Sequence, residues 1–136
     1  MTFDHIGVFV PDIEDGQKKL EAILPIAEWG EIFDDETLHV RVCFGEIAHG
    51  LRYELVAPFG SPNPVSGVLE SGRNVLNHVA YRVADLDAAA SALRETGAVP
   101  MGPAKPAIAF AGARVMFFLT AMGFIIELVE NIQERH

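Results

Sequence analysis

The apolar positions of this chain change period along its length, from the runs typical of β-strands to the three-and-four spacing of an α-helix. A β-rich run at residues 6–10 is followed by apolar residues at helical spacing from Ile13 to Leu24. We expect this helix to begin after Asp12, because an aspartate side chain accepts hydrogen bonds from the amides of the first turn. The helix should end before Pro25, which cannot continue it.

The second half of the chain repeats this order of elements. A β-rich run at residues 78–83 precedes Asp85, which is expected to cap a helix that starts at Leu86 and stops at Gly97. Further strands are expected after a loop in each half. They cover residues 40–44 and 51–56 in the first half, and residues 113–119 and 123–129 in the second.

The two halves are related by a constant shift of 73 positions (78 − 5). With that shift, residues 4–7 fall on residues 77–80, and residues 54–56 fall on residues 127–129, without a gap. Internal repetition of this kind indicates one structural unit written twice.

A segment rich in proline and glycine separates the two copies. We place module one at about residues 1–58, the connector at about 59–74 and module two at about 75–131. Each module is too small to bury a core alone. The two are therefore expected to pack together as a single domain over residues 1–136.

Each module contains one histidine and one glutamate, and both pairs have the same spacing of 49 positions (54 − 5 and 127 − 78). His5 and His78 lie in the first strand of their modules, and Glu54 and Glu127 lie inside apolar strands. A buried carboxylate is costly unless it is paired or bound to a cation. A single residue of either type is more often structural, but the repeated pair favours a site at which approximate two-fold symmetry brings all four side chains together.

Strand periodicity also indicates the neighbours of the two glutamates. Alternation places Glu54 on the same face as Arg52, and Glu127 on the same face as Ile125. Imidazole and carboxylate together suit zinc, cobalt, nickel, manganese or iron, and four protein ligands leave two octahedral positions open. The sequence therefore predicts a divalent metal site.

Composition narrows the class of partner. The formal charge of −9 and the scattered basic residues disfavour nucleic acid and anionic membranes. No apolar stretch is long enough to span a bilayer, and the N-terminus lacks the basic flank of a signal peptide. Cys43 is the only cysteine, so we expect no intramolecular disulfide, and we interpret Cys43 as a core residue in a reducing compartment. These features favour a soluble, cytoplasmic globular protein that binds neither nucleic acid nor membranes.

On its repeated modules and His/Glu pairs, the chain resembles the vicinal oxygen chelate superfamily of glyoxalase I, methylmalonyl-CoA epimerase, extradiol dioxygenases and the fosfomycin or bleomycin resistance proteins. The resemblance covers nearly the whole chain and implies an α+β fold of two tandem βαβββ modules, forming an open eight-stranded barrel-like sheet around a metal site. It assigns one divalent ion (cobalt, nickel, manganese or zinc) to His5, Glu54, His78 and Glu127. This set argues against the extradiol dioxygenases, whose iron is held by two histidines and one carboxylate. The resemblance also implies a homodimer.

Within that superfamily, the chain is most similar to methylmalonyl-CoA epimerase around the start and the end of the second module. The similar segments are residues 53–58, 61–62, 65–69, 76–83, 85–87 and 123–128. The likeness implies a metal-dependent isomerase that removes a proton alpha to a carbonyl, with an acyl thioester or a 2-oxo compound as substrate. Glu36 roughly matches the position of the epimerase base. Glu127 is the second candidate, because a ligand glutamate acts as base in glyoxalase I-like enzymes.

Two other functions remain open. One is a glyoxalase I-type lactoylglutathione lyase or a related metal enzyme, and the other is a non-catalytic, drug-sequestering protein. The drug-sequestering members usually lack the paired ligands, which favours an enzyme. The loops at residues 109–113 and 119–122 depart from the epimerase pattern and are expected to face the substrate. The residues therefore support the metal chemistry more firmly than the identity of the substrate.

Overall fold

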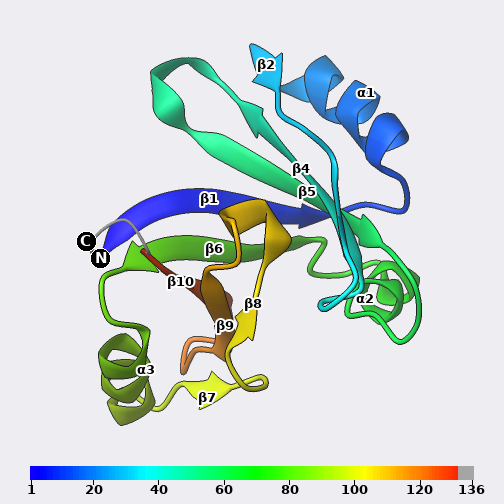
Figure 1. Ribbon diagram of the computed structural model, residues 1–136. Helices are drawn as coiled ribbons and strands as arrows, with labels where there is room; N and C mark the ends of the chain where they lie inside the picture. Colours follow the sequence, from blue (N-terminus) through cyan, green and yellow to red (C-terminus); the bar gives the residue numbers. More distant parts are fainter. Residues whose placement is uncertain (132–136) are drawn as a thin grey trace. The chain divides into compact units, whose positions relative to one another are not determined.

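The computed structural model describes residues 1–131, which contain ten β-strands and three α-helices (Figure 1). These residues form two compact units. The first-module unit contains His5–Asn77, and the second-module unit contains the residues from His78 on together with Met1–Asp4. The elements of the first module are β1 (Thr2–Phe9), α1 (Ile13–Ile23), β2 (Glu28–Trp29), β3 (Phe33–Asp35), β4 (Val40–Glu46) and β5 (Arg52–Pro58). They are followed by α2 (Ser66–Ser71), β6 (Leu76–Val83), α3 (Leu86–Glu95), β7 (Val99–Pro100), β8 (Lys105–Pro106), β9 (Arg114–Leu119) and β10 (Ile125–Glu130).

The two units share one strand arrangement. The first-module unit has the order β2-β4-β5-β1, with β3 also pairing with β4. The second-module unit has the order β6-β10-β9-β7, with β8 also pairing with β9. In each unit the first and last strands run parallel and the other pairs are antiparallel. The α+β class and the two βαβββ modules expected from the sequence are therefore confirmed.

The second strand of each module is split into two short pieces, so that residues 1–131 contain ten strands where eight were expected. β2 and β3 both pair with β4, and β7 and β8 both pair with β9. The break in the second module contains Gly102, at a φ of 153°, and Pro103. Proline has no amide hydrogen to donate to a strand ladder, which explains why pairing stops there.

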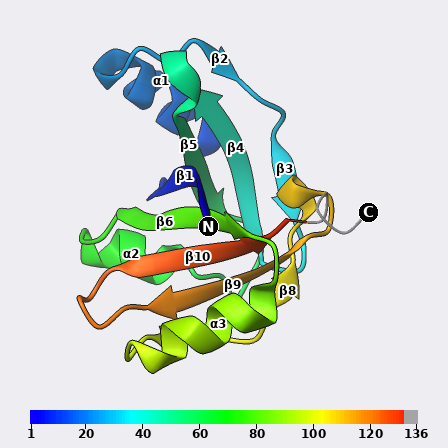
Figure 2. The same ribbon diagram turned by 90° about the vertical axis from the view of Figure 1, so that its left-hand side faces the viewer.

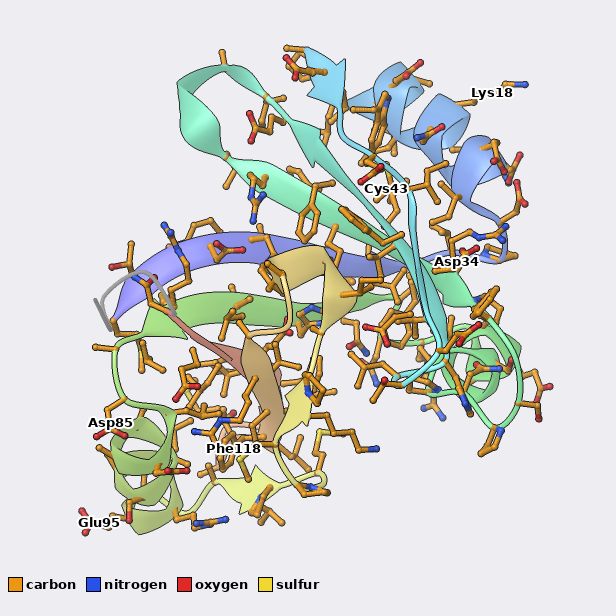
Figure 3. The ribbon with its side chains drawn as sticks, viewed as in Figure 1. Lys18, Asp34, Cys43, Asp85, Glu95 and Phe118 are labelled. Carbon is orange, nitrogen blue, oxygen red and sulfur yellow. The ribbon has the colours of Figure 1, made fainter. Side chains whose placement is uncertain are left out.

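Helix α1 covers one face of the first-module sheet and forms the core on that side. Asp12 accepts a hydrogen bond from the amide of Asp15 at the start of the helix, as predicted. Ile13 packs with Cys43 and Leu55, and Cys43 lies on β4 beside α1 (Figure 3). Burial raises the pKa of the Cys43 thiol, as expected for a core residue.

Helix α3 takes the same place in the second-module unit, where it lies along β9 and β10 (Figure 2). Asp85 caps it by accepting from the amide of Ala88. Leu86 packs with Phe118 and Leu128, all of which are fully buried. Each module therefore buries the sheet face that is turned towards its own helix.

An aromatic ring occupies the same position in both cores, but it comes from a different strand in each module. Gly45 on β4 and Phe118 on β9 are related by the repeat (118 − 45 = 73). A Cβ atom at Gly45 would lie 2.6 Å from the ring of Trp29, which comes from β2. In the second module the aromatic ring belongs to Phe118 itself, and Figure 3 shows it within that unit. The repeat thus preserves aromatic packing without preserving the residue.

The connector contains the short helix α2, which the sequence pattern did not predict. The side chain of Asn63 accepts from the amides of Val65 and Ser66 where the helix begins. The helix ends at Gly72, whose φ of 68° suits glycine. None of the helices within residues 1–131 combines the length and apolar character that crossing a membrane would require.

Each module has an arginine at an equivalent position that forms an ion pair with a carboxylate on a neighbouring strand. Arg41 pairs with Asp34 on β3, and its hydrogen bond holds the pKa of that carboxyl below its usual value. Arg114 donates two hydrogen bonds to Glu130 on β10, at 3.1 and 2.9 Å. Asp34 is exposed, whereas Glu130 is 4% exposed. The second pair should therefore matter more for stability.

This difference predicts that Arg114→Ala lowers the free energy of unfolding by about 1–3 kcal/mol, because a buried carboxylate loses two guanidinium hydrogen bonds. Arg41→Ala removes the equivalent side chain beside an exposed carboxylate and serves as the matched control, with a clearly smaller effect. Urea unfolding of both variants measures the two changes. Equal losses would contradict the assignment of Glu130 as the more important partner.

Candidate metal centre

In the first-module unit, His5 and Glu54 form a buried pair on the sheet face turned away from α1. Glu54 lies opposite Gly7 in the parallel β1–β5 pairing, and His5 precedes Gly7 by two residues. Nε2 of His5 is 3.2 Å from Oε1 of Glu54, and the two residues are 0% and 6% exposed. Leu55 packs on the α1 side, so alternation turns Glu54 to the opposite face, as predicted.

The second-module unit repeats this geometry with His78 and Glu127. Glu127 lies opposite Ala80 in the parallel β6–β10 pairing, and His78 again precedes that partner by two residues. Nε2 of His78 is 3.2 Å from Oε1 of Glu127, and the residues are 5% and 3% exposed. We call the face that carries the pair in each unit the ligand face. The spacing of 49 in the sequence thus corresponds to one strand register used twice.

A phenylalanine from the neighbouring strand packs against each histidine ring. Phe44 on β4 lies opposite Glu54, and its ring meets the His5 ring edge-to-face at 5.2 Å between centroids. Phe117 on β9 lies opposite Glu127 and meets His78 at 5.3 Å. These contacts restrict the orientation of both imidazoles. Sequence analysis assigned the two phenylalanines no role, although their matched positions in the repeat were the available signal.

The donor chemistry and the distances of both pairs suit a divalent metal. Bonds of about 2.0–2.2 Å from one ion to nitrogen and oxygen place neighbouring ligands about 3.0–3.4 Å apart. The 3.2 Å separation in each pair falls in this range. The same separation suits a hydrogen bond from the ring N–H to the carboxylate, so metal titration is what distinguishes the two. Imidazole and carboxylate are ligands that transition metals share.

Two neighbouring acidic residues before β4, Asp35 and Glu36, differ in burial. Glu36 is exposed in the turn that follows β3. Asp35 is 4% exposed and pairs with Val40, which places it on the ligand face of the first-module unit. Its Oδ1 accepts from the amides of Thr37 and Leu38 and fixes the turn on which Glu36 lies. The sequence alone did not indicate the burial of Asp35, because that burial depends on the register between β3 and β4.

Comparison with known proteins places these features in a family. The family model of the Glyoxalase/Bleomycin resistance protein/Dioxygenase superfamily matches residues 4–117. A curated ethylmalonyl-CoA/methylmalonyl-CoA epimerase from Cereibacter sphaeroides is 32% identical over 115 residues, which are 84% of this chain and 84% of that protein.

Solved structures of methylmalonyl-CoA epimerases share the fold. The enzyme from Mycobacterium tuberculosis superposes with a TM-score of 0.79 at 23% identity, over 98% of this chain and 90% of that chain. A variant of the Streptomyces coelicolor enzyme, in complex with 2-nitronate-propionyl-CoA, gives a TM-score of 0.76 at 24% identity, over 97% and 98% of the two chains. By its fold, its repeated modules and the match over residues 4–117, this chain belongs to the Glyoxalase/Bleomycin resistance protein/Dioxygenase superfamily.

Proposed function

We propose that this protein is a metal-dependent epimerase that moves a proton at the carbon alpha to the thioester carbonyl of a carboxylated acyl-CoA. The observation that carries the proposal is the pair of buried His–Glu sets at one strand register in the two units. The similarity to the Cereibacter sphaeroides epimerase supports the reaction class. Burying a carboxylate within a sheet costs free energy, and each module does so once, which favours a chemical role for the two glutamates.

In this proposal one divalent ion (cobalt, nickel, manganese or zinc) is held jointly by His5, Glu54, His78 and Glu127. A bound ion would supply Lewis acidity, which would polarise a carbonyl oxygen and acidify the neighbouring C–H bond. The chain supplies the ligands and their orientation. Phe44 and Phe117 restrict the imidazole rings, so that little rearrangement is needed on binding.

Proton transfer in this proposal is assigned to carboxylates. Glu36 is the first candidate for the base, and Glu127 is the second. The turn that bears Glu36 is fixed by the two amide hydrogen bonds to Asp35, so Asp35 acts as a positioning residue. A carboxylate that takes the α-proton on one side of the carbon, and an acid that returns one on the other side, together invert the configuration.

Metal stoichiometry tests whether the two pairs act together. The wild-type protein should bind one equivalent of Co²⁺ or Ni²⁺ per chain by isothermal titration calorimetry. His5→Ala or His78→Ala alone should weaken this binding by more than the roughly 10- to 100-fold loss caused by removing an outer-sphere partner. His39→Ala is the control, because His39 contacts the carbonyl of Pro62 in the first-module unit. Two equivalents per chain, or full binding after loss of either histidine, would contradict a shared site.

Deuterium exchange tests the reaction. Metal-loaded protein incubated with methylmalonyl-CoA in deuterated water should place deuterium at the α-carbon, as measured by mass spectrometry. Glu36→Gln should slow exchange by about 10²- to 10⁴-fold, the usual contribution of a general base, with metal binding unchanged. Glu31→Gln, an exposed glutamate in the loop before β3, is the matched control.

The same assay separates the alternatives. No exchange with any 2-substituted malonyl thioester overturns the epimerase proposal, and turnover of the glutathione–methylglyoxal adduct in its place identifies a glyoxalase-type lyase. Full exchange activity in Glu36→Gln, together with loss of activity but retained Co²⁺ binding in Glu127→Gln, moves the role of base to Glu127.

A further inference from the structure

The ligand faces of the two units differ at the position next to the glutamate. Arg52 on β5 and Ile125 on β10 are equivalent in the repeat (125 − 52 = 73), and each precedes its glutamate by two residues on the same face. Arg52 is half-buried, and so is Ile125. A cationic side chain therefore lies about 7 Å along the strand from one proposed ligand only.

The neighbouring positions show the same division. In the first-module unit, Arg52 lies opposite Glu46, and Glu46 lies opposite Glu28. The equivalent ladder in the second-module unit consists of Ile125, Leu119 and Val99. At this end of the ligand face, next to Arg52 or Ile125, the first module is therefore polar and the second is apolar.

Arg52 is held in place by the aromatic ring that also contacts a proposed ligand. Its guanidinium carbon lies 4.2 Å from the centroid of the Phe44 ring, and Phe44 meets His5 edge-to-face. Stacking on the ring fixes the plane of the guanidinium group. Arginine binds carboxylates through two hydrogen bonds that lie in this plane. The stacking also restricts the side chain before a ligand arrives, which reduces the entropy lost on binding.

We propose that Arg52 binds the carboxylate of the substrate's acyl group and so selects malonyl-type thioesters over neutral acyl thioesters. This inference rests on the proposed function. In a malonyl thioester the carboxylate is attached to the α-carbon, so a group that binds it must lie beside the metal ligands, as Arg52 does. The phosphates of coenzyme A are separated from the α-carbon by the whole pantetheine arm and require a more distant partner. The chain's net charge of −9 gives an anionic substrate no long-range attraction, so a local cation such as Arg52 favours its binding.

Ligand binding tests the inference without relying on turnover. Calorimetry would compare wild type, Arg52→Gln and Arg52→Lys with three ligands: methylmalonyl-CoA, propionyl-CoA, and the N-acetylcysteamine thioester of methylmalonate, which lacks the nucleotide. Arg52→Gln should weaken both methylmalonyl ligands by about 10- to 100-fold, the worth of charged hydrogen bonds, and leave propionyl-CoA unchanged. Arg52→Lys should retain part of the affinity, because lysine keeps the positive charge but lacks the planar pair of N–H donors of a guanidinium group.

Arg41→Gln is the matched control. It removes the same charge from the same unit, but Arg41 on β4 pairs with Asp34 on the face opposite to Phe44. Co²⁺ titration and thermal unfolding of each variant establish that the metal site and the fold are intact.

The outcomes distinguish this inference from the function on which it rests. Equal weakening of methylmalonyl-CoA and propionyl-CoA by Arg52→Gln, with the short thioester unaffected, assigns Arg52 to a coenzyme A phosphate and overturns the inference. Unchanged affinity of Arg52→Gln for all three ligands overturns the inference as well. In that case, exchange activity of the wild type still supports the epimerase proposal. Absence of binding and of exchange in the wild type overturns both.

Discussion

Two buried His–Glu pairs impose the main physical constraint on this structure. An imidazole and a carboxylate lose hydration when they are buried together, and their mutual attraction restores only part of it. Both pairs lie on sheets whose other buried positions are mostly apolar, and both keep a 3.2 Å separation at one strand register. The cost of this burial, and its repetition at one strand register, are the grounds for the proposed ligand-binding role of the two pairs.

Helices α1 and α3 each cover one face of the sheet in their own module, and the His–Glu pairs lie on the other face. Ile13 and Leu86 bury the helix-side faces in the two units and supply the core that a module of this size needs. The other faces then accept polar groups whose orientation is set by neighbouring strands, as Phe44 and Phe117 set the two imidazoles. The bidentate contact between Arg114 and Glu130 ties the last strand to β9 in the second-module unit. Rigid strands suit a metal site, because small errors in ligand position weaken binding.

The two modules keep their ligands and differ in what surrounds them. Phe118 supplies from β9 the aromatic ring that Trp29 supplies above Gly45 in the first module, so the cores are filled differently. On the ligand faces, Arg52 stands where the second module has Ile125. A duplicated module can hold a metal with its shared residues and recognise an asymmetric substrate with the residues that differ.

The amino-acid sequence by itself determined the module order, the helix caps at Asp12 and Asp85, and the spacing that singles out the four proposed ligands. These follow from local periodicity and from a constant repeat offset, both of which are properties of the linear chain. Alternation along β5 even placed Arg52 beside Glu54. Only the tertiary structure decided which side chains meet across strands: Phe44 against His5, Arg52 against Phe44, and Asp35 on the ligand face while Glu36 stays exposed. Those contacts depend on strand register, which is set by pairing between segments distant in sequence.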